Sequence, residues 1–236
     1  MKRLAINQDI LKIIALVTMT CDHLRHFIDV PQAVNAAMYL IGRTAFPIFA
    51  YLMMLHLAQM DLSGYKKYLM RLGYFGVLSF FIFAPIHGLF DVSLALPFNI
   101  LITFWIAVAA LYLIYMIENS SLNTFIKYVL LWGVIAIAGG TSVLSDYGFA
   151  GFCFILCFYF YFRRQTPDWI VFCLIFSAMI NESWGGVVSL ITTIGLLLFV
   201  YPVSEPRLLR RWWIFYVYYP LHIVLIACAA YLLDKF

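Results

Sequence analysis

Long apolar segments follow one another along the whole chain, and they restrict its fold more than any other feature. A helix that crosses a bilayer needs about 20 consecutive apolar residues, and windows of that length select nine segments in the 236 residues. They are 10–28, 38–58, 69–87, 97–117, 125–142, 147–162, 168–182, 187–203 and 212–232. The connecting loops are short, and no repeat or soluble region interrupts the series. We therefore predict one all-α membrane domain over residues 1–236, with about nine transmembrane helices.

The amino-acid composition supports the same class of protein. Charged residues make up 11% of the chain, whereas an average soluble domain has roughly 25%. With 65% hydrophobic residues, the chain has too little polar surface to form a water-soluble globule. The five cysteines lie in apolar segments, at spacings that fit neither a zinc site nor a disulfide framework. We expect packing roles for them, and no metal.

The distribution of lysine and arginine predicts how the spans are oriented. If the N-terminus is cytoplasmic, 12 of the 15 basic residues fall on the cytoplasmic side of the nine spans. Basic residues concentrate in the cytoplasmic loops of membrane proteins. We therefore predict a cytoplasmic N-terminus and a C-terminus on the outer side.

Ionisable residues gather at the outer end of the first two spans. The run Asp22-His23-Leu24-Arg25-His26 closes the first segment, and Arg43 opens the second on the same predicted side. Such groups are costly in hydrocarbon and usually face a bundle interior or a watery cavity. Asp22 can meet Arg25 or His26, three and four positions on. We expect these side chains to form a polar site.

Further polar residues fall on the same predicted side. They come from other span ends: His87, Asp91, Asn99, Asp146 and Glu182. Their convergence is what a site at one mouth of a helical bundle would produce. Alternatively, residues in outer loops are polar because the loops contact water, and this is the interpretation we favour for Asp91 and Glu182.

His23 is the member of this group best suited to proton transfer. It lies on one helical stripe with Lys12, at a separation of roughly 16 Å along the axis. A catalytic His23 would need an orienting carboxylate from another span, for which Asp146 is the candidate. The alternative is a packing or hydrogen-bonding role for His23.

Two more residues have both a functional and a structural interpretation. The guanidinium of Arg43 can hold an anion or a carbonyl in a fixed fork, or it can reach outward to lipid headgroups. His222, close to Pro220 in the last span, fits a structural hydrogen bond and a place in the site equally well.

Basic pairs mark the predicted cytoplasmic loops. Lys66-Lys67, Arg163-Arg164 and Arg210-Arg211 could hold the phosphates of a nucleotide-containing donor, although topology and anionic lipid account for them more simply. The sequence contains no phosphate loop, dinucleotide fingerprint, nucleophile elbow or metal motif. Nothing in it supports nucleic-acid binding.

Several motifs together resemble the TraX family. The first span carries Lys12-Ile13-Ile14-Ala15-Leu16 and then Asp22-His23, and the second carries Gly42-Arg43-Thr44-Ala45-Phe46-Pro47-Ile48-Phe49-Ala50. Weaker matches follow in order: Asn99-Ile100-Leu101, Tyr147-Gly148-Phe149-Ala150-Gly151, Phe215-Tyr216 and Tyr219-Pro220-Leu221-His222. The first span is also similar, more distantly, to acyltransferase-3 membrane proteins, in which a histidine ending that span is implicated in acyl transfer.

The resemblance implies an enzyme, a membrane-bound acetyltransferase of the bacterial inner membrane. Plasmid members of the family acetylate the N-terminus of F-type pilin with acetyl-coenzyme A. This chain would likewise take acetyl-coenzyme A from the cytoplasm and acetylate an acceptor on the outer side, a pilin N-terminal amine or a glycan or lipid. Catalytic roles would fall to His23, Asp22, Arg43 and Asp146. Binding roles would fall to Lys12, Arg25, His26, Asn99, His222, Lys66, Lys67, Arg163 and Arg164.

A proton-coupled transporter is the rival class, because Asp22, His23 and Arg43 could also act as a proton relay and substrate clamp. Transporters often contain inverted repeats, and the sequence shows none, which counts against that class. The acceptor, the acyl chain length and the oligomeric state stay open. Beyond donor and acceptor, we expect lipid as a partner and no nucleic acid.

Overall fold

The computed structural model describes residues 4–90, 99–204 and 213–233, and nearly all of them lie in helices. The helices are α1 (Gln8–Leu24), α2 (Gln32–Gly42), α3 (Ala45–Leu57), α4 (Leu62–Phe90), α5 (Ile100–Glu118), α6 (Thr124–Ser142), α7 (Gly148–Arg164), α8 (Asp168–Met179), α9 (Ser183–Phe199) and α10 (Trp213–Leu233). Two short strands, β1 (Leu4–Asn7) and β2 (Val200–Val203), pair in parallel. The predicted helical class is confirmed. Asp91, Arg210 and Arg211 lie outside the described residues.

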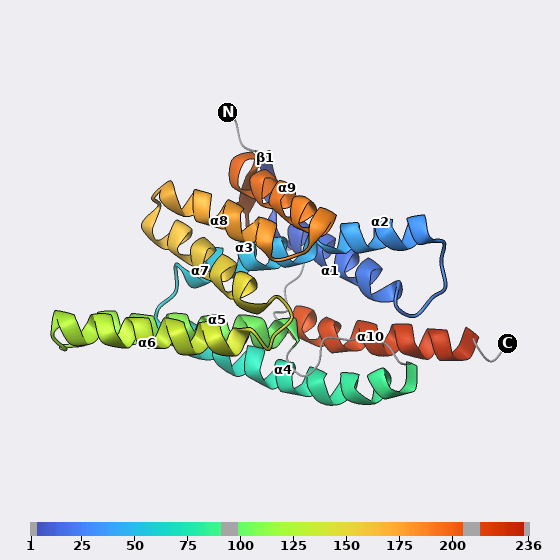
Figure 1. The fold of residues 1–236 in the computed structure, drawn as a ribbon, viewed down its shortest axis with the longest axis horizontal. Coiled ribbons are helices and arrows are strands. Elements are labelled where there is room, and N and C mark those ends of the chain that lie inside the picture. The colour runs from blue at the N-terminus through green and yellow to red at the C-terminus, as the bar shows by residue number, and fades with distance from the viewer. Residues whose placement is uncertain (1–3, 91–98, 205–212, 234–236) are drawn as a thin grey trace.

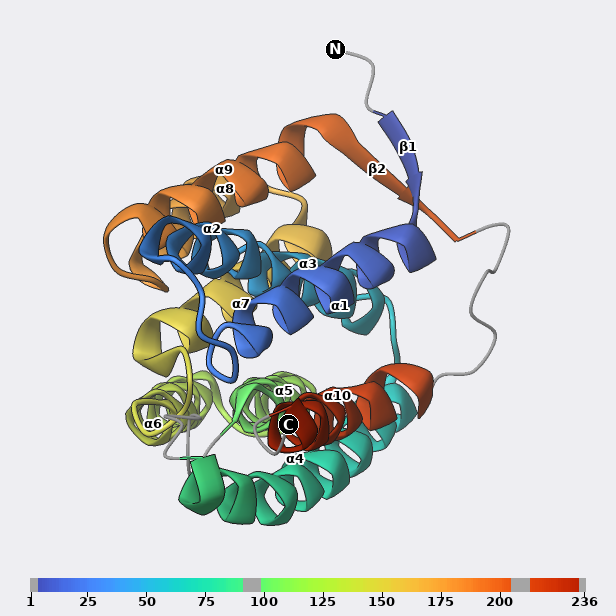
Figure 2. The same ribbon diagram turned by 90° about the vertical axis from the view of Figure 1, so that its right-hand side faces the viewer.

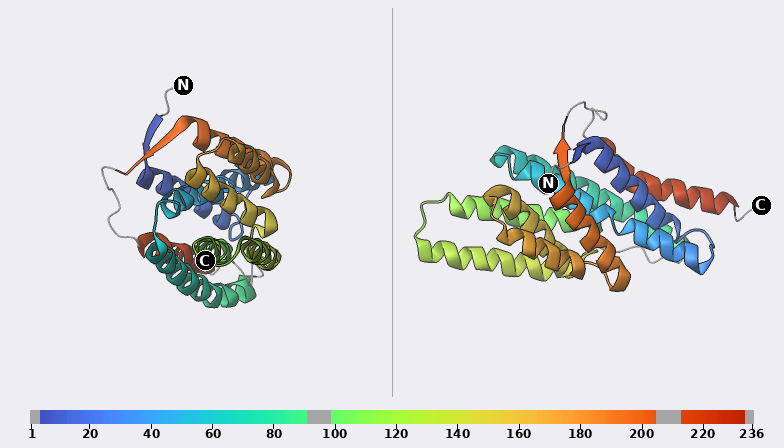
Figure 3. Two further views of the ribbon diagram at one scale, coloured as in Figure 1. Left: turned by 90° about the vertical axis from the view of Figure 1, so that its left-hand side faces the viewer. Right: turned by 90° about the horizontal axis from the view of Figure 1, so that it is seen from above.

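The helices form two layers. In Figures 1 and 2 the long helices α4, α5, α6 and α10 make up one layer, and α1, α2, α3, α7, α8 and α9 make up the other. Helix α5 packs against α4, α6 and α7, and α10 packs against α4 and α1, so both helices join the layers. In Figure 3 the turn between α5 and α6 lies at the opposite end of the molecule from the end of α10.

Five helical stretches of the described chain are long and apolar enough to cross a membrane. They are Gln32–Leu57, Leu62–Ile86, Ile100–Glu118, Thr124–Ser142 and Trp213–Leu233. The remaining helices, α1, α7, α8 and α9, have 12 to 17 residues. A helical membrane protein is therefore the class that the structure supports. The count of nine spans and the sides of the two termini stay predictions.

The second predicted span, 38–58, differs from expectation because it is not one helix. The assigned helix stops after Gly42 although Arg43 and Thr44 keep right-handed helical dihedrals, so α2 and α3 meet at a short interruption formed by these two residues. A Cβ on Gly42 would lie 2.3 Å from the Cβ of Asp22, so only glycine lets α2 approach α1 this closely. Pro47 then falls in the first turn of α3, where a missing N–H is tolerated.

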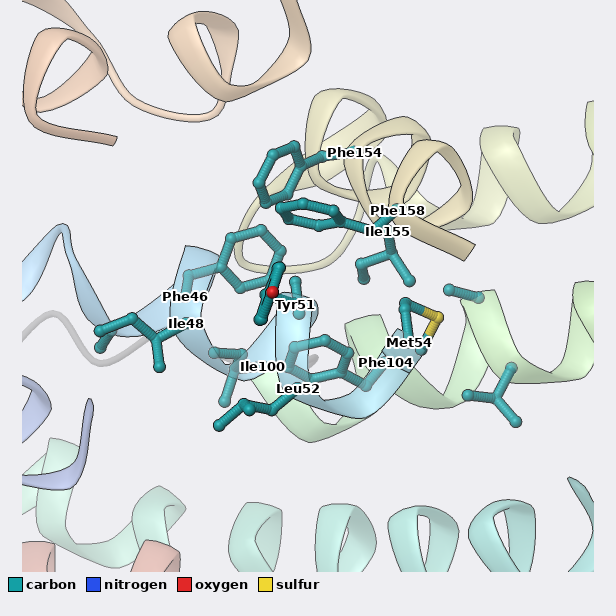
Figure 4. Packing of buried hydrophobic residues seen from close by; sticks show 14 of the residues in the cluster. Phe46, Ile48, Tyr51, Leu52, Met54, Ile100, Phe104, Phe154, Ile155 and Phe158 are labelled. Atoms are coloured by element: carbon teal, nitrogen blue, oxygen red, sulfur yellow. The ribbon is translucent and has the colours of Figure 1, made fainter. Parts of the chain in front are cut away.

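The core lies where α3 passes between α5 and α7 (Figure 4). The ring of Phe46 in α3 is 5.5 Å from that of Phe104 in α5 and 5.8 Å from that of Phe154 in α7, measured between centroids. Tyr51 meets Phe158 edge to face at 5.6 Å. Because Phe46 is fully buried three residues after Arg43, this packing fixes where the interruption holds the guanidinium.

Candidate functional site

A polar cavity of about 250 Å³, here called the outer cavity, lies beside the C-terminal end of α1 and the interruption between α2 and α3. Its lining includes six of the residues predicted to act together: Asp22, His23, Arg25, His26, Arg43 and Asp146. Phe83, Tyr147, Asn181, Tyr219 and Ile223 complete it. The expected polar residues therefore line one cavity, and residues from three helices (α1, α4 and α10) and four connecting segments build it.

Asp22 is the electrostatic anchor of the outer cavity. Its Oδ1 accepts a hydrogen bond from Nε of Arg25 at 2.8 Å, as the three-residue spacing predicts. Its Oδ2 accepts from Nη2 of Arg43. Both carboxylate oxygens are thus held by guanidinium groups, an arrangement that stabilises the ionised form. Asp22 joins α1 to the interruption and is poorly placed to exchange protons itself.

Arg43 is held on a second side by α8 and α9. Its Nη1 donates to Oδ1 of Asn181 at 3.0 Å, and Nδ2 of Asn181 donates to the Ser189 hydroxyl at 2.8 Å. Its guanidinium also lies over the ring of Tyr39, 4.6 Å from the centroid. Nε of Arg43 is buried and has no hydrogen-bond acceptor in the described part of the chain. Sequence reasoning missed Asn181 and Ser189, because neither residue type is unusual at the end of an apolar segment.

His23 has a partner other than the expected carboxylate. Its Nδ1 lies 2.6 Å from Nε2 of His222, and the two rings meet edge to edge, with 4.9 Å between centroids and 23° between planes. Nδ1 of His222 lies 2.9 Å from the carbonyl oxygen of Tyr218. Asp146 lines the same cavity, but no hydrogen bond joins it to His23 among the described residues. The group that orients His23 is therefore a second histidine, 199 positions away.

Asp146 lies in the segment between α6 and α7 and is exposed. Desolvation by the protein atoms around its carboxyl raises the pKa of that group above its ordinary value. The backbone N–H of Ile100 and the charge of Arg43 oppose this rise.

A second, larger cavity of about 370 Å³, here called the inner cavity, runs along the other half of α1. Its wall is mostly apolar, with Leu16, Phe49 and Phe104 among the lining residues. Three basic side chains also line it: Lys12, His56 and Arg71. Nζ of Lys12 donates to Asp9 at 2.9 Å and lies 5.1 Å from the ring centre of Phe215.

A small cavity of about 40 Å³, here called the link, lies between the inner and outer cavities. It shares Met19, Ile100 and Tyr219 with the inner cavity, and it shares His23 and Asp146 with the outer cavity. The three cavities therefore form a series along α1, with Lys12 lining one end of the series and His23 lining the link and the outer cavity. This series follows the predicted stripe of α1.

The two basic pairs within the described residues, Lys66-Lys67 and Arg163-Arg164, line none of these cavities. Lys66 and Lys67 are exposed near the start of α4. Nη1 of Arg163 donates to the carbonyl oxygen of Ala58 at 3.1 Å, and Arg164 pairs with Glu118 at 4.0 Å. The expectation that these four residues bind the donor gains no support from their positions. Arg71 and His56, to which sequence reasoning gave no role, are the basic residues that accompany Lys12.

Asn99 also has a structural place. Its Oδ1 accepts from the backbone N–H of Leu101 at 3.0 Å, which caps α5, and its Nδ2 donates to the carbonyl oxygen of Gly76 at 3.0 Å. The residue is 1% exposed and lines none of the three cavities. These contacts join α5 to α4, and the predicted binding role of Asn99 stays a prediction.

Fold and cavities together define a polytopic helical membrane protein with an ionisable site inside its bundle. The chain belongs to the TraX family, because the model of the family described as "TraX protein" matches residues 7–229, nearly the whole chain. The resemblance seen in the motifs is thereby confirmed, and it supports a function related to pilin and conjugation. No curated protein and no solved structure matches the chain.

Proposed function

We propose that the protein is an acetyltransferase that moves an acetyl group from cytoplasmic acetyl-coenzyme A to an acceptor on the outer side of the membrane. The acceptor we favour is the N-terminal amine of a pilin subunit, and the family match supports this choice. The observation that carries the proposal is the position of His23. It lies where an apolar cavity and a polar cavity meet inside one bundle.

The inner cavity suits the donor. Acetyl-coenzyme A combines anionic phosphates with a long, weakly polar arm that ends in the thioester. Lys12 and Arg71 line the inner cavity and offer positive charge to phosphates, while the apolar wall that extends past Leu16 to Met19 accepts the arm. The thioester would then reach the link, next to His23.

His23 would act as the general base for acyl transfer. The acceptor amine attacks the thioester carbonyl carbon, a C–N bond forms, and the C–S bond to coenzyme A breaks. A ring nitrogen of His23 takes the proton that the amine loses and returns it to the departing sulfur. General-base catalysis of this kind contributes roughly 10²- to 10⁴-fold in rate.

Arg43 and Asp146 would support this step from the outer cavity. Nε of Arg43 is a buried donor without an acceptor in the described chain, which suits it to stabilising the oxyanion that forms during attack. Asp146 offers a carboxylate in the same cavity, which favours a cationic amine over a neutral hydroxyl as the acceptor.

The test is transfer of labelled acetyl groups in proteoliposomes that contain the purified protein. The acceptor is a peptide with a free N-terminal amine, and the control peptide has a blocked one. We expect His23→Gln to lower the rate by roughly 10² or more with a loss of stability of only about 1 kcal/mol. Lys67→Gln, a change at an exposed site distant from the cavities, should leave the rate unchanged.

Two results would reject the proposal. A His23→Gln protein with full activity would remove the assigned base. Failure of the wild-type protein to transfer acetyl groups, together with substrate-driven proton uptake into the vesicles, would instead establish the transporter class.

A further inference from the structure

We propose that His222 is a positioning residue that holds His23 in the tautomer with its proton on Nδ1, which leaves Nε2 of His23 as the basic nitrogen. The catalytic consequence rests on the proposed function, whereas the tautomer is a property of the protein and is measurable without any substrate. The inference follows from the hydrogen bonds that His222 makes within α10 and to His23 in α1.

The first step is the contact of His222 with its own helix. Nδ1 of His222 lies 2.9 Å from the carbonyl oxygen of Tyr218, one turn earlier in α10. A carbonyl oxygen can only accept a hydrogen bond. Nδ1 of His222 must therefore carry a proton, whatever the state of the other ring nitrogen.

The second step is the charge of His222. The residue is 3% exposed, and its hydrogen-bond partners in the described chain are the Tyr218 carbonyl and His23. No carboxylate pairs with it there, because both oxygens of Asp22 are bound by Arg25 and Arg43. A buried cation without a counter-charge is strongly disfavoured, so His222 is neutral and its Nε2 carries a lone pair.

The third step transfers this constraint to α1. Nε2 of His222 lies 2.6 Å from Nδ1 of His23. Since Nε2 can only accept, Nδ1 of His23 must donate, and its proton is fixed there. In neutral His23 the lone pair is then on Nε2, which has no hydrogen-bond partner among the described residues.

Neighbouring contacts hold the two rings in place. The His222 ring meets the His23 ring edge to edge, with 4.9 Å between centroids, and lies nearly parallel to the Tyr218 ring, with 5.2 Å between centroids. The Tyr218 hydroxyl lies 2.8 Å from that of Thr20, which in turn donates to the carbonyl oxygen of Leu16. A second polar contact thus fixes α10 against α1 one turn below the histidine pair, so that His222 cannot turn away without breaking several contacts.

This chain of bonds does for His23 what a buried carboxylate does for the histidine of a hydrolytic triad. In a triad the carboxylate fixes the imidazole tautomer, and its replacement by an amide lowers kcat by about 10⁴ through the wrong tautomer. Here a neutral imidazole is the acceptor. It brings no negative charge, so its contribution lies in orientation.

The test is nitrogen NMR of the histidine side chains in protein labelled at histidine, with His23→Gln used to assign the signals. We expect wild-type His23 to show a protonated Nδ1 and an unprotonated Nε2. In His222→Phe, which keeps a ring but removes the acceptor, we expect that pattern to be lost. His222→Gln, whose side-chain oxygen can accept in place of Nε2, should retain it.

The same variants give a kinetic reading. We expect His222→Phe to lower kcat by roughly 10²-fold while the KM for acetyl-coenzyme A stays within a factor of about two. His222→Gln should restore most of the loss. Thr192→Val is the control: it removes a hydroxyl that donates within α9 to the carbonyl oxygen of Val188 at 2.8 Å and lines none of the three cavities, so it should change neither the tautomer nor kcat.

The results separate this inference from the proposed function. A wild-type spectrum with the proton on Nε2 of His23 overturns the inference, even if neither His222 variant folds. An unchanged His23 tautomer in His222→Phe also overturns it, whether or not acetyl transfer occurs. If the tautomer shifts as expected but the wild-type protein transfers no acetyl group, the positioning role stands and the proposed function fails.

Discussion

Neighbouring residues at the end of α1 have different tasks, and stability measurements should separate them. Asp22 holds two guanidinium groups, with its side chain 11% exposed and that of Arg43 15% exposed. Removing one partner of a buried ion pair leaves the other charge uncompensated, at a cost of about 3–5 kcal/mol. We therefore expect Asp22→Asn to lower the free energy of unfolding by about 3 kcal/mol.

His23→Gln is the matched comparison, because it removes only hydrogen bonding between neutral groups. Such a loss costs about 1 kcal/mol. Unfolding in mixed micelles with increasing denaturing detergent would measure both variants. Equal destabilisation of the two proteins would contradict the division of roles between an anchoring Asp22 and a chemically active His23.

Gly42 is also important for stability, because a larger residue at this position would collide with Asp22. A Cβ at this position would lie 2.3 Å from Cβ and 2.7 Å from Cγ of Asp22, so α2 or Asp22 must shift. We expect Gly42→Ala to lower the free energy of unfolding by about 1–3 kcal/mol and to reduce acetyl transfer, because the shift disturbs the pair with Arg43.

The control for Gly42 is Gly133→Ala in α6, where an added Cβ meets nothing within 4 Å. Alanine is a better helix former than glycine by about 1 kcal/mol, so this variant should be as stable as wild type or slightly more stable. If both alanine variants were stabilised, the close approach of α1 and α2 at Gly42 would be refuted.

At the scale of helices, two asparagine caps offer a direct comparison. Asn99 caps α5 in the core and also bonds to α4, whereas Asn123 caps α6 through the N–H of Ile126 in an exposed position. Loss of a cap costs about 1 kcal/mol, and loss of the additional hydrogen bond to the Gly76 carbonyl costs about 1 kcal/mol more. We expect Asn99→Ala to be about 2 kcal/mol less stable than wild type and Asn123→Ala about 1 kcal/mol less stable.

The same pair tests whether Asn99 binds substrate. A structural residue changes stability while leaving the KM values for donor and acceptor near those of wild type, as long as the assay temperature is below the unfolding range. A large rise in KM for Asn99→Ala, without a loss of stability, would return the residue to the binding role that its sequence position suggested.

Helices themselves were predictable from the sequence, but their interruptions were not. Apolar length locates most spans, and the pair between Asp22 and Arg25 follows from their spacing on one helix. At the break after Gly42 the chain approaches Asp22 closely, and Asp22 lies in another helix, α1. Local sequence does not contain that information, since a glycine in an apolar run is common in membrane helices.

At the scale of the whole molecule, the composition of the site was partly predictable and its pairing was not. Topology indicated that Asp22, Arg43 and Asp146 share one side of the membrane, and all three line the outer cavity. The partner of His23 depends on how α10 is rotated and shifted against α1. That register is set by packing across the bundle, such as the contact between Thr20 and Tyr218, so no pattern in the sequence could select His222 over Asp146.

The series of cavities predicts that donor and acceptor approach from opposite ends of the bundle and meet at the link. Met19 lines both the inner cavity and the link and is 7% exposed. We expect Met19→Trp to fill the link, a space of about 40 Å³, and to abolish transfer from acetyl-coenzyme A enclosed in vesicles to a peptide outside. Acetyl-coenzyme A should still bind, and its binding should still raise the melting temperature, because a ligand that binds only the folded state stabilises it.

Met70→Trp is the control for Met19→Trp, because Met70 is 75% exposed on α4 and lines none of the three cavities in the series. It should leave both binding and transfer unchanged. If Met19→Trp transferred acetyl groups at the wild-type rate, the acetyl group would not pass through the link. Transfer by wild type only when donor and peptide are on the same side would show that the two substrates share one entrance, and the inner cavity would then need another occupant.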